Sequence, residues 1–465
     1  MNDHITAACT PHKNAKRTYF DGQILANNDF AIGTTYRREI TREGVELVVD
    51  ENGPLVVSSK SVRGANHAKP LVDICNREFA DYVGEAEQVH IHAEQGRILI
   101  TVHANEQRRA QRENDFIQAV NSGTLTEGTL CAGIGMSTAA LHDGFASAGY
   151  DVETQWIADR ERKYLDVAMR NNPAVTSATR VLNSPLEMIE LDWYNSVNIC
   201  QFSLPCTGHS KSGKTKNKIA IAEQHPTDAV GVYGYLKALD TINAAVYLSE
   251  NVPEAKDSAS YVLIKATLQA LGYNIFETIL NNEQSGSIEN RERYWFVAVS
   301  KGLRLAAETA IPCYPRAHQR LGEIMEPIAA DDKMWSENTY LKEKAKLDAK
   351  KGNGFTRQLV NEDTTQVGTI NRHYTKRQST PPMVARPDGM ERLLTPVEHA
   401  RAKQCNEALV ADTPMTIAHE GLGQGIDMKQ GEGMAKWIAM AVCNLVKAPR
   451  QTMTTQFEFL DLMLA

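Results

Sequence analysis

A cysteine and a glutamate, each placed at the end of a short apolar segment, have the residue types that covalent chemistry needs. Cys206 follows NICQFSLP, and Glu250 ends AAVYLSE. Open α/β sheets place their ligands at the carboxyl ends of strands, where a thiolate favoured by the nearby cations of Lys211 and Lys214 is a nucleophile. A carboxylic acid in the same position can donate a proton. Taken alone, such a cysteine is more often a buried structural residue, and such a glutamate a surface or helix-capping residue.

Two glycines in LCAGIGM could let the backbone approach a nucleotide-like ligand. Gly133 and Gly135 follow an apolar segment and precede a helical pattern. This arrangement alone also describes an ordinary tight turn from a strand to a helix. Asp159 favours the ligand-binding interpretation, because it ends the next predicted strand, where a carboxylate can accept hydrogen bonds from ribose hydroxyls.

Two arginines precede the apolar segment YWFVAV. Alternate residues of a strand share one face, so Arg291 and Arg293 are predicted to point the same way. Two guanidinium groups on one face suit phosphate and base oxygens. The alternative is a ladder of surface salt bridges.

The elements that must position these residues form an α/β pattern. From Thr126, apolar segments of four to six residues alternate with helical patterns, which predicts a parallel sheet with helices on its faces. We predict a catalytic domain over residues 123–305. Residues 306–392 are polar, loop-rich and locally basic, which indicates an inserted irregular domain, and helical patterns resume over residues 393–465.

The N-terminal part has a different texture. Residues 1–103 are predicted to form a small β-rich domain, with one helix around Leu71 to Val83. Residues 104–122 carry many charges without a helix breaker and are predicted to form a connecting helix.

Composition excludes several classes of protein. The 465 residues carry a net charge of −7, so any nucleic-acid site must be a local basic strip. The eight cysteines form no CxxC pair or other metal-ligand spacing, so we expect no metal site and a reduced, cytoplasmic protein. The N-terminal residues lack the continuous apolar core of a signal peptide, and no apolar segment approaches the roughly 20 residues that span a bilayer, so we expect neither export nor insertion into a membrane.

In order along the chain, these motifs resemble those of the cytosine carbon-5 DNA methyltransferases. The resemblance covers about residues 125 to 450 and rests on six segments: LCAGIGM, LPCTGHS, Glu250-Asn251-Val252, GSIENRERYWFVAV, RLLTPVEHARAKQ and GLGQGI. Four positions depart from the family pattern and indicate a divergent branch: Leu204, Thr207, Glu289 and Gln424. None of these departures removes the nucleophile, the acid or the arginines.

The resemblance implies a Rossmann-like fold that binds S-adenosylmethionine and methylates carbon 5 of cytosine. Cys206 would attack carbon 6 of the base, Glu250 would assist at ring nitrogen 3, and Arg293 with Arg291 would hold the base oxygen and a phosphate. The base would be flipped out of double-stranded DNA. The implied cofactor contacts are Cys131, Ala132, Gly133, Ile134, Gly135, Asp159, Arg160, Pro205 and Gln424.

The resemblance also assigns parts of the chain. Residues 306–392 would read the target sequence in the major groove, and the C-terminal segment would fold back onto the cofactor side. The N-terminal segment from RGANHAKPLVDIC to QGRILIT resembles swapped-hairpin DNA-binding modules of the AbrB type, with a dimerisation or packing domain as the alternative.

Two other functions stay open: an RNA cytosine methyltransferase on the same scaffold, and a DNA-binding relative without turnover. The target sequence, the oligomeric state and the pairing with a restriction enzyme are not determined by the sequence.

Overall fold

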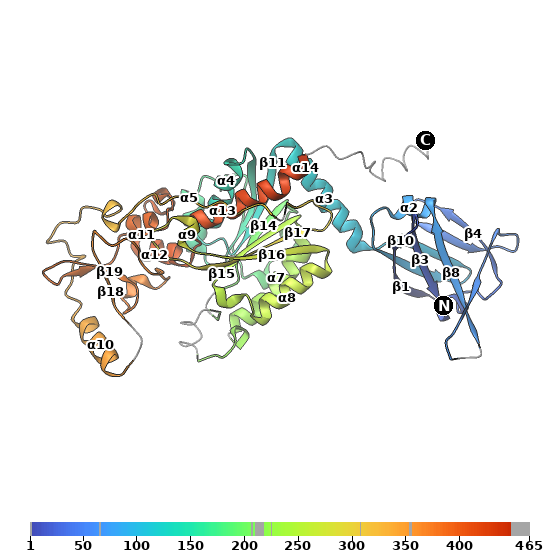
Figure 1. Cartoon of the computed structure of the whole chain (residues 1–465), viewed down its shortest axis with the longest axis horizontal. Helices are drawn as coiled ribbons and strands as arrows, with labels where there is room; N and C mark the ends of the chain where they lie inside the picture. The colour runs from blue at the N-terminus through green and yellow to red at the C-terminus, as the bar shows by residue number, and fades with distance from the viewer. Residues whose placement is uncertain are drawn as a thin grey trace. The chain divides into compact units, whose positions relative to one another are not determined.

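The computed structural model of the protein comprises two compact units (Figure 1), one ending at Gln111 and the other beginning at Arg112. The described residues are 2–64, 67–205, 208–209, 218–224, 226–306, 308–352 and 356–447.

A seven-stranded sheet organises the second unit. Its strands, in order across the sheet, are β13 (Arg180–Leu182), β12 (Asp151–Ala158), β11 (Thr124–Leu130), β14 (Ile199–Phe202), β15 (Val246–Asn251), β17 (Arg293–Ser300) and β16 (Tyr273–Leu280). The first five strands are parallel, as predicted, whereas β17 runs antiparallel to both β15 and β16. The prediction of an α/β sheet is confirmed, and the antiparallel pair at one edge is an addition to it.

Helices cover both faces of this sheet because its strands are apolar on both sides. Side chains of α3 (Ala104–Ser122), α4 (Met136–Ala146) and α13 (Met428–Ile438) pack with Leu125 and Val297 in one core. Side chains of α7 (Pro226–Ile242) and α8 (Ala259–Ala270) pack with Phe202 and Phe296 in another. α5 (Arg162–Asn171) contributes to a third, smaller core.

Residues after β17 contain few regular elements, in line with their irregular pattern. They include α10 (Thr339–Lys350) and a small sheet of β18 (Gln358–Val360), β19 (Pro382–Ala385) and β20 (Glu391–Arg392). This region has its own core, which includes Leu321, Tyr374 and Met383.

The C-terminal helices return to the seven-stranded sheet. They are α11 (Pro396–Ala402), α12 (Met415–Gln424), α13 and the short α14 (Asn444–Lys447), and a π-helical turn (Ala439–Cys443) separates the last two. α13 lies against α4 so closely that a Cβ on Gly144 would be 2.5 Å from the Cβ of Ala435.

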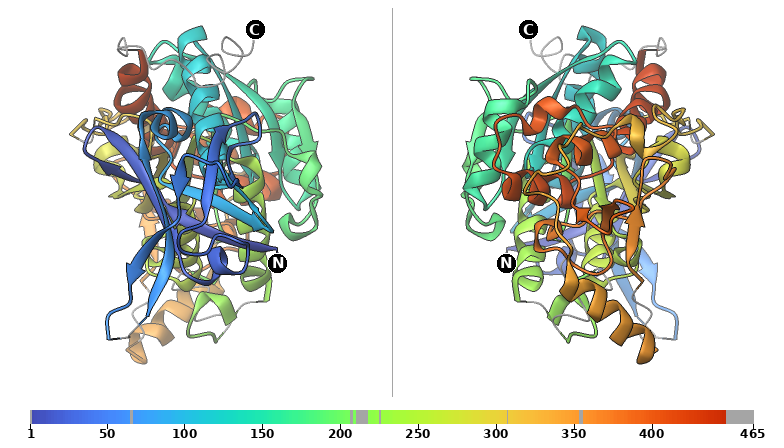
Figure 2. Two further views of the ribbon diagram at one scale, coloured as in Figure 1. Left: turned by 90° about the vertical axis from the view of Figure 1, so that its right-hand side faces the viewer. Right: turned by 90° about the vertical axis from the view of Figure 1, so that its left-hand side faces the viewer.

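The N-terminal unit is built mainly of two antiparallel sheets (Figure 2, left), with the short helix α1 (Gln23–Ala26) and the helix α2 (Arg77–Val83). One contains β1 (Asp3–Ala8), β9 (Gln88–Glu94), β10 (Arg97–Val102), β5 (Val45–Val49), β4 (Thr35–Ile40) and β6 (Leu55–Val56). The other contains β2 (Thr10–His12), β3 (Ala15–Asp21), β8 (Ala68–Asn76) and β7 (Ser58–Ser61).

The helix predicted around Leu71 to Val83 is wrong in its first half. Leu71 to Asn76 belong to β8, with Val72 and Ile74 buried on one face of the strand. The helix α2 begins only at Arg77, because the side chain of Asn76 caps it by accepting a hydrogen bond from the backbone NH of Phe79.

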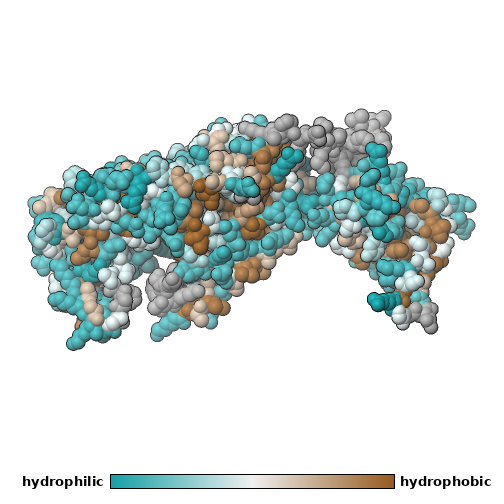
Figure 3. All heavy atoms as spheres, viewed as in Figure 1, coloured by the Kyte–Doolittle hydropathy of each residue, from teal (hydrophilic) through white to brown (hydrophobic). Residues whose placement is uncertain are grey.

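No helix among the described residues is long and apolar enough to cross a membrane. The face shown in Figure 3 is mostly hydrophilic, with separate hydrophobic areas.

Candidate active site

The candidate active site lies where the order of the strands reverses. From β11 the chain continues through β12 and β13 to one side of the sheet, and from β14 through β15 to the other. The crevice beside the carboxyl ends of such strands is the usual ligand site of an open α/β sheet. Four of the predicted residues lie at the carboxyl ends of these parallel strands: Gly133, Asp159, Pro205 and Glu250. The fold therefore brings them together at one end of the sheet, which we call the carboxyl end.

The loop after β11 has a backbone that glycine favours. Gly133 and Gly135 have φ values of 56° and 82°, in the left-handed region. The backbone NH of Gly133 donates a hydrogen bond to Asp159 Oδ2 over 2.9 Å, and that of Glu161 donates to Oδ1 over 2.8 Å. Burial raises the pKa of Asp159. Asp159 therefore fixes the loop directly, a role that its predicted contact with a ribose did not include.

The predicted cofactor residue Gln424 reaches this loop from the C-terminal segment. A Cβ on Gly133 would lie 3.7 Å from Gln424 Nε2. A Cβ on Gly421, one turn earlier in α12, would lie 2.6 Å from the side chain of Ile134, so glycine allows the helix to approach the loop. The structure thus brings the GLGQGI segment against the LCAGIGM segment.

The segment that leads to Cys206 is held from two sides. The carbonyl oxygen of Leu204 accepts a hydrogen bond from Asn251 Nδ2 over 2.8 Å, and that of Ser203 accepts one from the hydroxyl of Tyr235. Leu204 itself is buried in the core under α7 and α8. Cys206, Thr207, Lys211 and Lys214 lie outside the described residues.

Glu250 and Arg293 form an ion pair at the same carboxyl end of the sheet. Arg293 Nε lies 2.8 Å from Glu250 Oε1, and the two residues are 8% and 7% exposed. A charge-assisted contact of this kind fixes the orientation of a carboxyl group. The structure therefore joins the predicted acid to one of the two predicted arginines.

The prediction that Arg291 shares a strand face with Arg293 is wrong. β17 begins at Arg293, and the preceding residues leave the sheet, where the NH of Asn290 donates a hydrogen bond to the carbonyl of Val367. Arg291 is buried, donates to the carbonyl of Gly423 over 3.1 Å and pairs with Glu289 over 3.4 Å. Its guanidinium thus supports α12 rather than joining Glu250.

A buried ion pair that the sequence did not reveal explains the departure at position 289. Glu289 Oε2 lies 2.9 Å from Lys403 Nζ, and both side chains are fully buried. Burial lowers the pKa of Lys403 to about 8, while the cations of Lys403 and Arg291 outweigh burial and hold the pKa of Glu289 below its ordinary value. The only signal in the sequence was an acid where the family pattern has glutamine.

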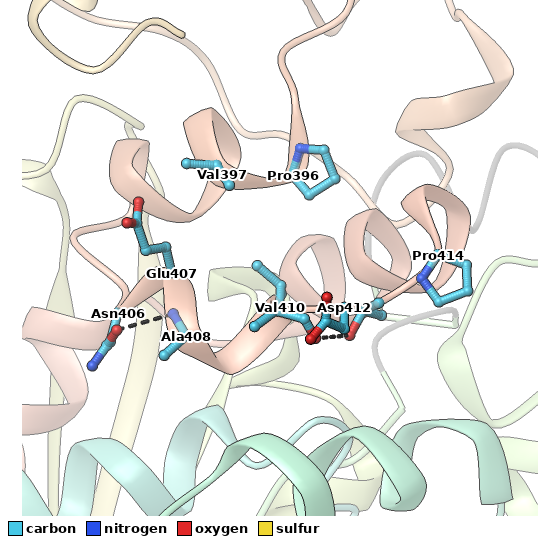
Figure 4. Close-up of a pocket in the computed structure, with 10 residues that line it drawn as sticks. Pro396, Val397, Asn406, Glu407, Ala408, Val410, Asp412 and Pro414 are labelled. Carbon is cyan, nitrogen blue, oxygen red and sulfur yellow. Dashed lines mark hydrogen bonds between the residues drawn. The ribbon is translucent and has the colours of Figure 1, made fainter.

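An open cavity of about 820 Å³ lies away from these residues (Figure 4). Its lining includes Pro396, Asn406 and Pro414, near the start of α12, whereas Gln424 ends the same helix. The ten residues of α12 span about 15 Å. None of the predicted site residues lines the cavity, and no cluster of metal-ligating side chains occurs among the described residues.

Comparison with known proteins places this geometry in a family. The family model described as C-5 cytosine-specific DNA methylase matches residues 127–409. The chain is 25% identical over 231 residues to the type II methyltransferase M1.ScrFI of Lactococcus lactis subsp. cremoris, covering 48% of this chain and 57% of that protein. It is 23% identical over 231 residues to the type II methyltransferase M.SsoII of Shigella sonnei, covering 48% of this chain and 58% of that protein. The matched part therefore spans somewhat more than half the length of these relatives.

Solved structures share the fold. The Dnmt2 methyltransferase of S. pombe superposes with a TM-score of 0.54 at 16% identity, over 68% of this chain and 98% of its own. The methyltransferase EhMeth of Entamoeba histolytica gives a TM-score of 0.55 at 15% identity, over 68% of this chain and 98% of its own.

Proposed function

Because the chain belongs to the family of C-5 cytosine-specific DNA methylases, we propose that it transfers a methyl group from S-adenosylmethionine to carbon 5 of cytosine in double-stranded DNA. The observation that carries this proposal is the Glu250–Arg293 pair. This pair lies at the carboxyl end of the sheet, as do the glycine loop and the segment that leads to Cys206.

The residues at this edge fit S-adenosylmethionine. Gly133 leaves room between the loop and Gln424 that a side chain would fill. The carboxylate of Asp159 accepts one backbone hydrogen bond at each oxygen, and a carboxylate has roughly four acceptor positions, so it can still accept from ribose hydroxyls. When bound, the cofactor supplies an electrophilic methyl group. The predicted contacts of Ala132, Arg160 and Pro205 complete this proposed site.

The proposed chemistry assigns a separate role to each side chain. The thiolate of Cys206 adds to carbon 6, and the electron pair of the 5,6 double bond becomes available at carbon 5. Glu250 donates a proton or hydrogen bond to ring nitrogen 3, which relieves the negative charge that builds up on the ring. After methylation, carbon 5 loses its proton to water, the double bond re-forms and Cys206 leaves as a thiolate, while a proton donated to ring nitrogen 3 returns to Glu250.

Access to these atoms requires the base to leave the duplex, at a cost of a few kcal/mol. We propose that Arg293, which pairs with Glu250, also holds the extruded base. We propose that residues 306–392 read the target sequence, since they form a loop-rich region with its own core. A cytoplasmic location fits the substrate.

The test is methyl transfer by the purified full chain. Tritiated S-adenosylmethionine is offered with unmethylated duplex DNA or with tRNA, and we expect label in duplex DNA at carbon 5 of cytosine. Label in tRNA alone would favour an RNA methyltransferase. Binding of cofactor and DNA without transfer would favour a relative without turnover.

The variant Cys206→Ser separates the covalent step from binding. We expect it to abolish transfer while S-adenosylhomocysteine still binds, as measured by calorimetry. Substantial remaining transfer would refute the role of Cys206 as the nucleophile.

A further inference from the structure

A buried tyrosine connects the two loops of the candidate site. The hydroxyl of Tyr235, on α7, lies 2.9 Å from Cys131 Sγ and donates a hydrogen bond to the carbonyl oxygen of Ser203. Tyr235 is 1% exposed, and its ring packs against Phe202 with the ring centres 5.6 Å apart.

The register of the sheet explains why one side chain reaches both loops. β11 and β14 are parallel neighbours, and Leu130 is paired with Phe202 at their ends. Cys131 and Ser203 are therefore the first residues beyond two adjacent strand ends. Cys131 begins the glycine loop, and Ser203 is three residues before Cys206.

The direction of the two hydrogen bonds follows from the chemistry of the groups. A carbonyl only accepts, so the proton of Tyr235 points to Ser203. Cys131 must then donate its thiol proton to the oxygen of Tyr235. Burial raises the pKa of Cys131 to about 12, which keeps this thiol protonated near neutral pH. In such a chain each bond polarises and strengthens the next.

We propose that Tyr235 is a positioning residue that couples the cofactor loop to the nucleophile segment. A cofactor that orders Cys131 and the glycine loop would orient Tyr235 and, through Ser203, the backbone that leads to Cys206. Coupling of this kind is reciprocal, so each event favours the other. The inference rests on the function proposed above.

Asn251 holds the same segment without this coupling. Its amide donates to the carbonyl of Leu204 and to the hydroxyl of Tyr261, 3.1 Å away on α8. Neither contact involves the glycine loop. Among the described residues, no side chain other than Tyr235 forms hydrogen bonds with both Ser203 and Cys131.

The test compares Tyr235→Phe with a matched control, Tyr247→Phe. Tyr247 is also fully buried, donates to the carbonyl of Leu239 over 2.6 Å and accepts from the NH of Ala244 over 3.0 Å. Its hydroxyl lies at the amino end of β15, away from both loops. The controls for folding are the melting temperatures of both variants.

Two readouts are measured on the full chain: the Kd of S-adenosylhomocysteine, and the rate of the first turnover on unmethylated plasmid DNA with saturating S-adenosylmethionine. We expect Tyr235→Phe to weaken binding and to slow the first turnover, each by roughly 3- to 10-fold, the range that one hydrogen bond supports. Tyr247→Phe should lower the melting temperature and leave both readouts unchanged.

A double variant tests the hydrogen-bonded relay from Cys131 through Tyr235 to Ser203. Cys131→Ala should weaken S-adenosylhomocysteine binding, Cys131→Ser should weaken it less because a donor remains, and adding Cys131→Ala to Tyr235→Phe should have little further effect. Additive losses would overturn the relay.

Equal effects of Tyr235→Phe and Tyr247→Phe on cofactor binding and on the first turnover would show a structural role only. If the unaltered chain transfers no methyl group, the proposed function itself is wrong and this inference falls with it.

Discussion

Glu250 and Arg293 lie on two strands, β15 and β17, that are adjacent only in the folded sheet. The role proposed for each side chain depends on its contact with the other. Residue types and strand ends were enough to predict both from the sequence. Their contact was not predictable, because it depends on β17 lying antiparallel beside β15. Arg291 shows the opposite case: its spacing from Arg293 predicted a shared face, yet the strand begins two residues later.

Glu250→Gln should separate proton donation from orientation. Glutamine can still accept a hydrogen bond from Arg293 but is a far weaker acid, so we expect the rate of methyl transfer to fall by about 10²- to 10⁴-fold. S-adenosylhomocysteine binding, measured by calorimetry, should be nearly unchanged. A variant with close to normal turnover would contradict the role of Glu250 as an acid.

Lys403→Met should strongly destabilise the protein, because it removes the nearer of the two cations of the buried Glu289 carboxylate and leaves only Arg291, 3.4 Å away. Breaking a buried pair costs about 3–5 kcal/mol. Glu289→Gln combined with Lys403→Met restores the neutral amide of the family pattern and should recover most of that loss. Denaturant unfolding of the two single variants and the double variant measures the coupling, and simple additivity would show that the pair is not energetically linked.

At the level of elements, helix α10 is the clearest regular feature of the region assigned to target reading. Lys342 and Lys344 bind within this region, to the carbonyl of Gly389 and the hydroxyl of Ser379. Lys346, Lys350 and Lys351 are exposed at or beside the end of the helix. Exposed lysines clustered around the end of a helix suit a phosphate backbone.

Replacing Lys346, Lys350 and Lys351 together by Glu should weaken binding of duplex DNA. Each lost phosphate contact should reduce the slope of log affinity against log salt by about 0.9. Fluorescence anisotropy over a range of salt concentrations measures both effects. Lys301→Glu is the control. Lys301 is exposed just after β17, at the end of the sheet opposite the candidate site. Equal salt slopes for the two variants would remove α10 from the DNA-binding surface.

At the scale of the whole molecule, the catalytic sheet contains a buried acid that ties stability to pH. Glu127 in β11 accepts hydrogen bonds from the hydroxyls of Thr129 over 2.9 Å and Thr154 over 2.8 Å. Thr154 also contacts the ring of His142 over 2.9 Å. Burial raises the pKa of Glu127 to about 7, and burial lowers that of His142 to about 4.

The raised pKa of Glu127 predicts a loss of stability as pH rises. The unfolded chain ionises near pH 4.5 and the folded one near 7, so the folded state binds more protons between these values. The contribution is fully present below pH 4.5 and decreases by up to about 3 kcal/mol through pH 7. Denaturant unfolding at pH 5 and pH 7.5 should show a smaller difference for Glu127→Gln than for the unaltered chain. The same difference in both would place the pH dependence elsewhere.

The sequence by itself predicted the α/β sheet and the positions of the glycine loop, Asp159, Glu250 and Arg293 beside the ends of strands. These positions depend on local patterns: apolar periodicity, the ends of strands and residues with distinctive chemistry. The sequence misplaced the start of α2, since the alternation in β8 resembles one side of a helix over so short a segment. Only the tertiary structure decided that Arg291 supports Gly423, that Lys403 balances Glu289 and that Tyr235 joins Cys131 to Ser203. Each of these contacts joins residues distant in sequence, and their energy comes from burial and pairing that no local pattern encodes.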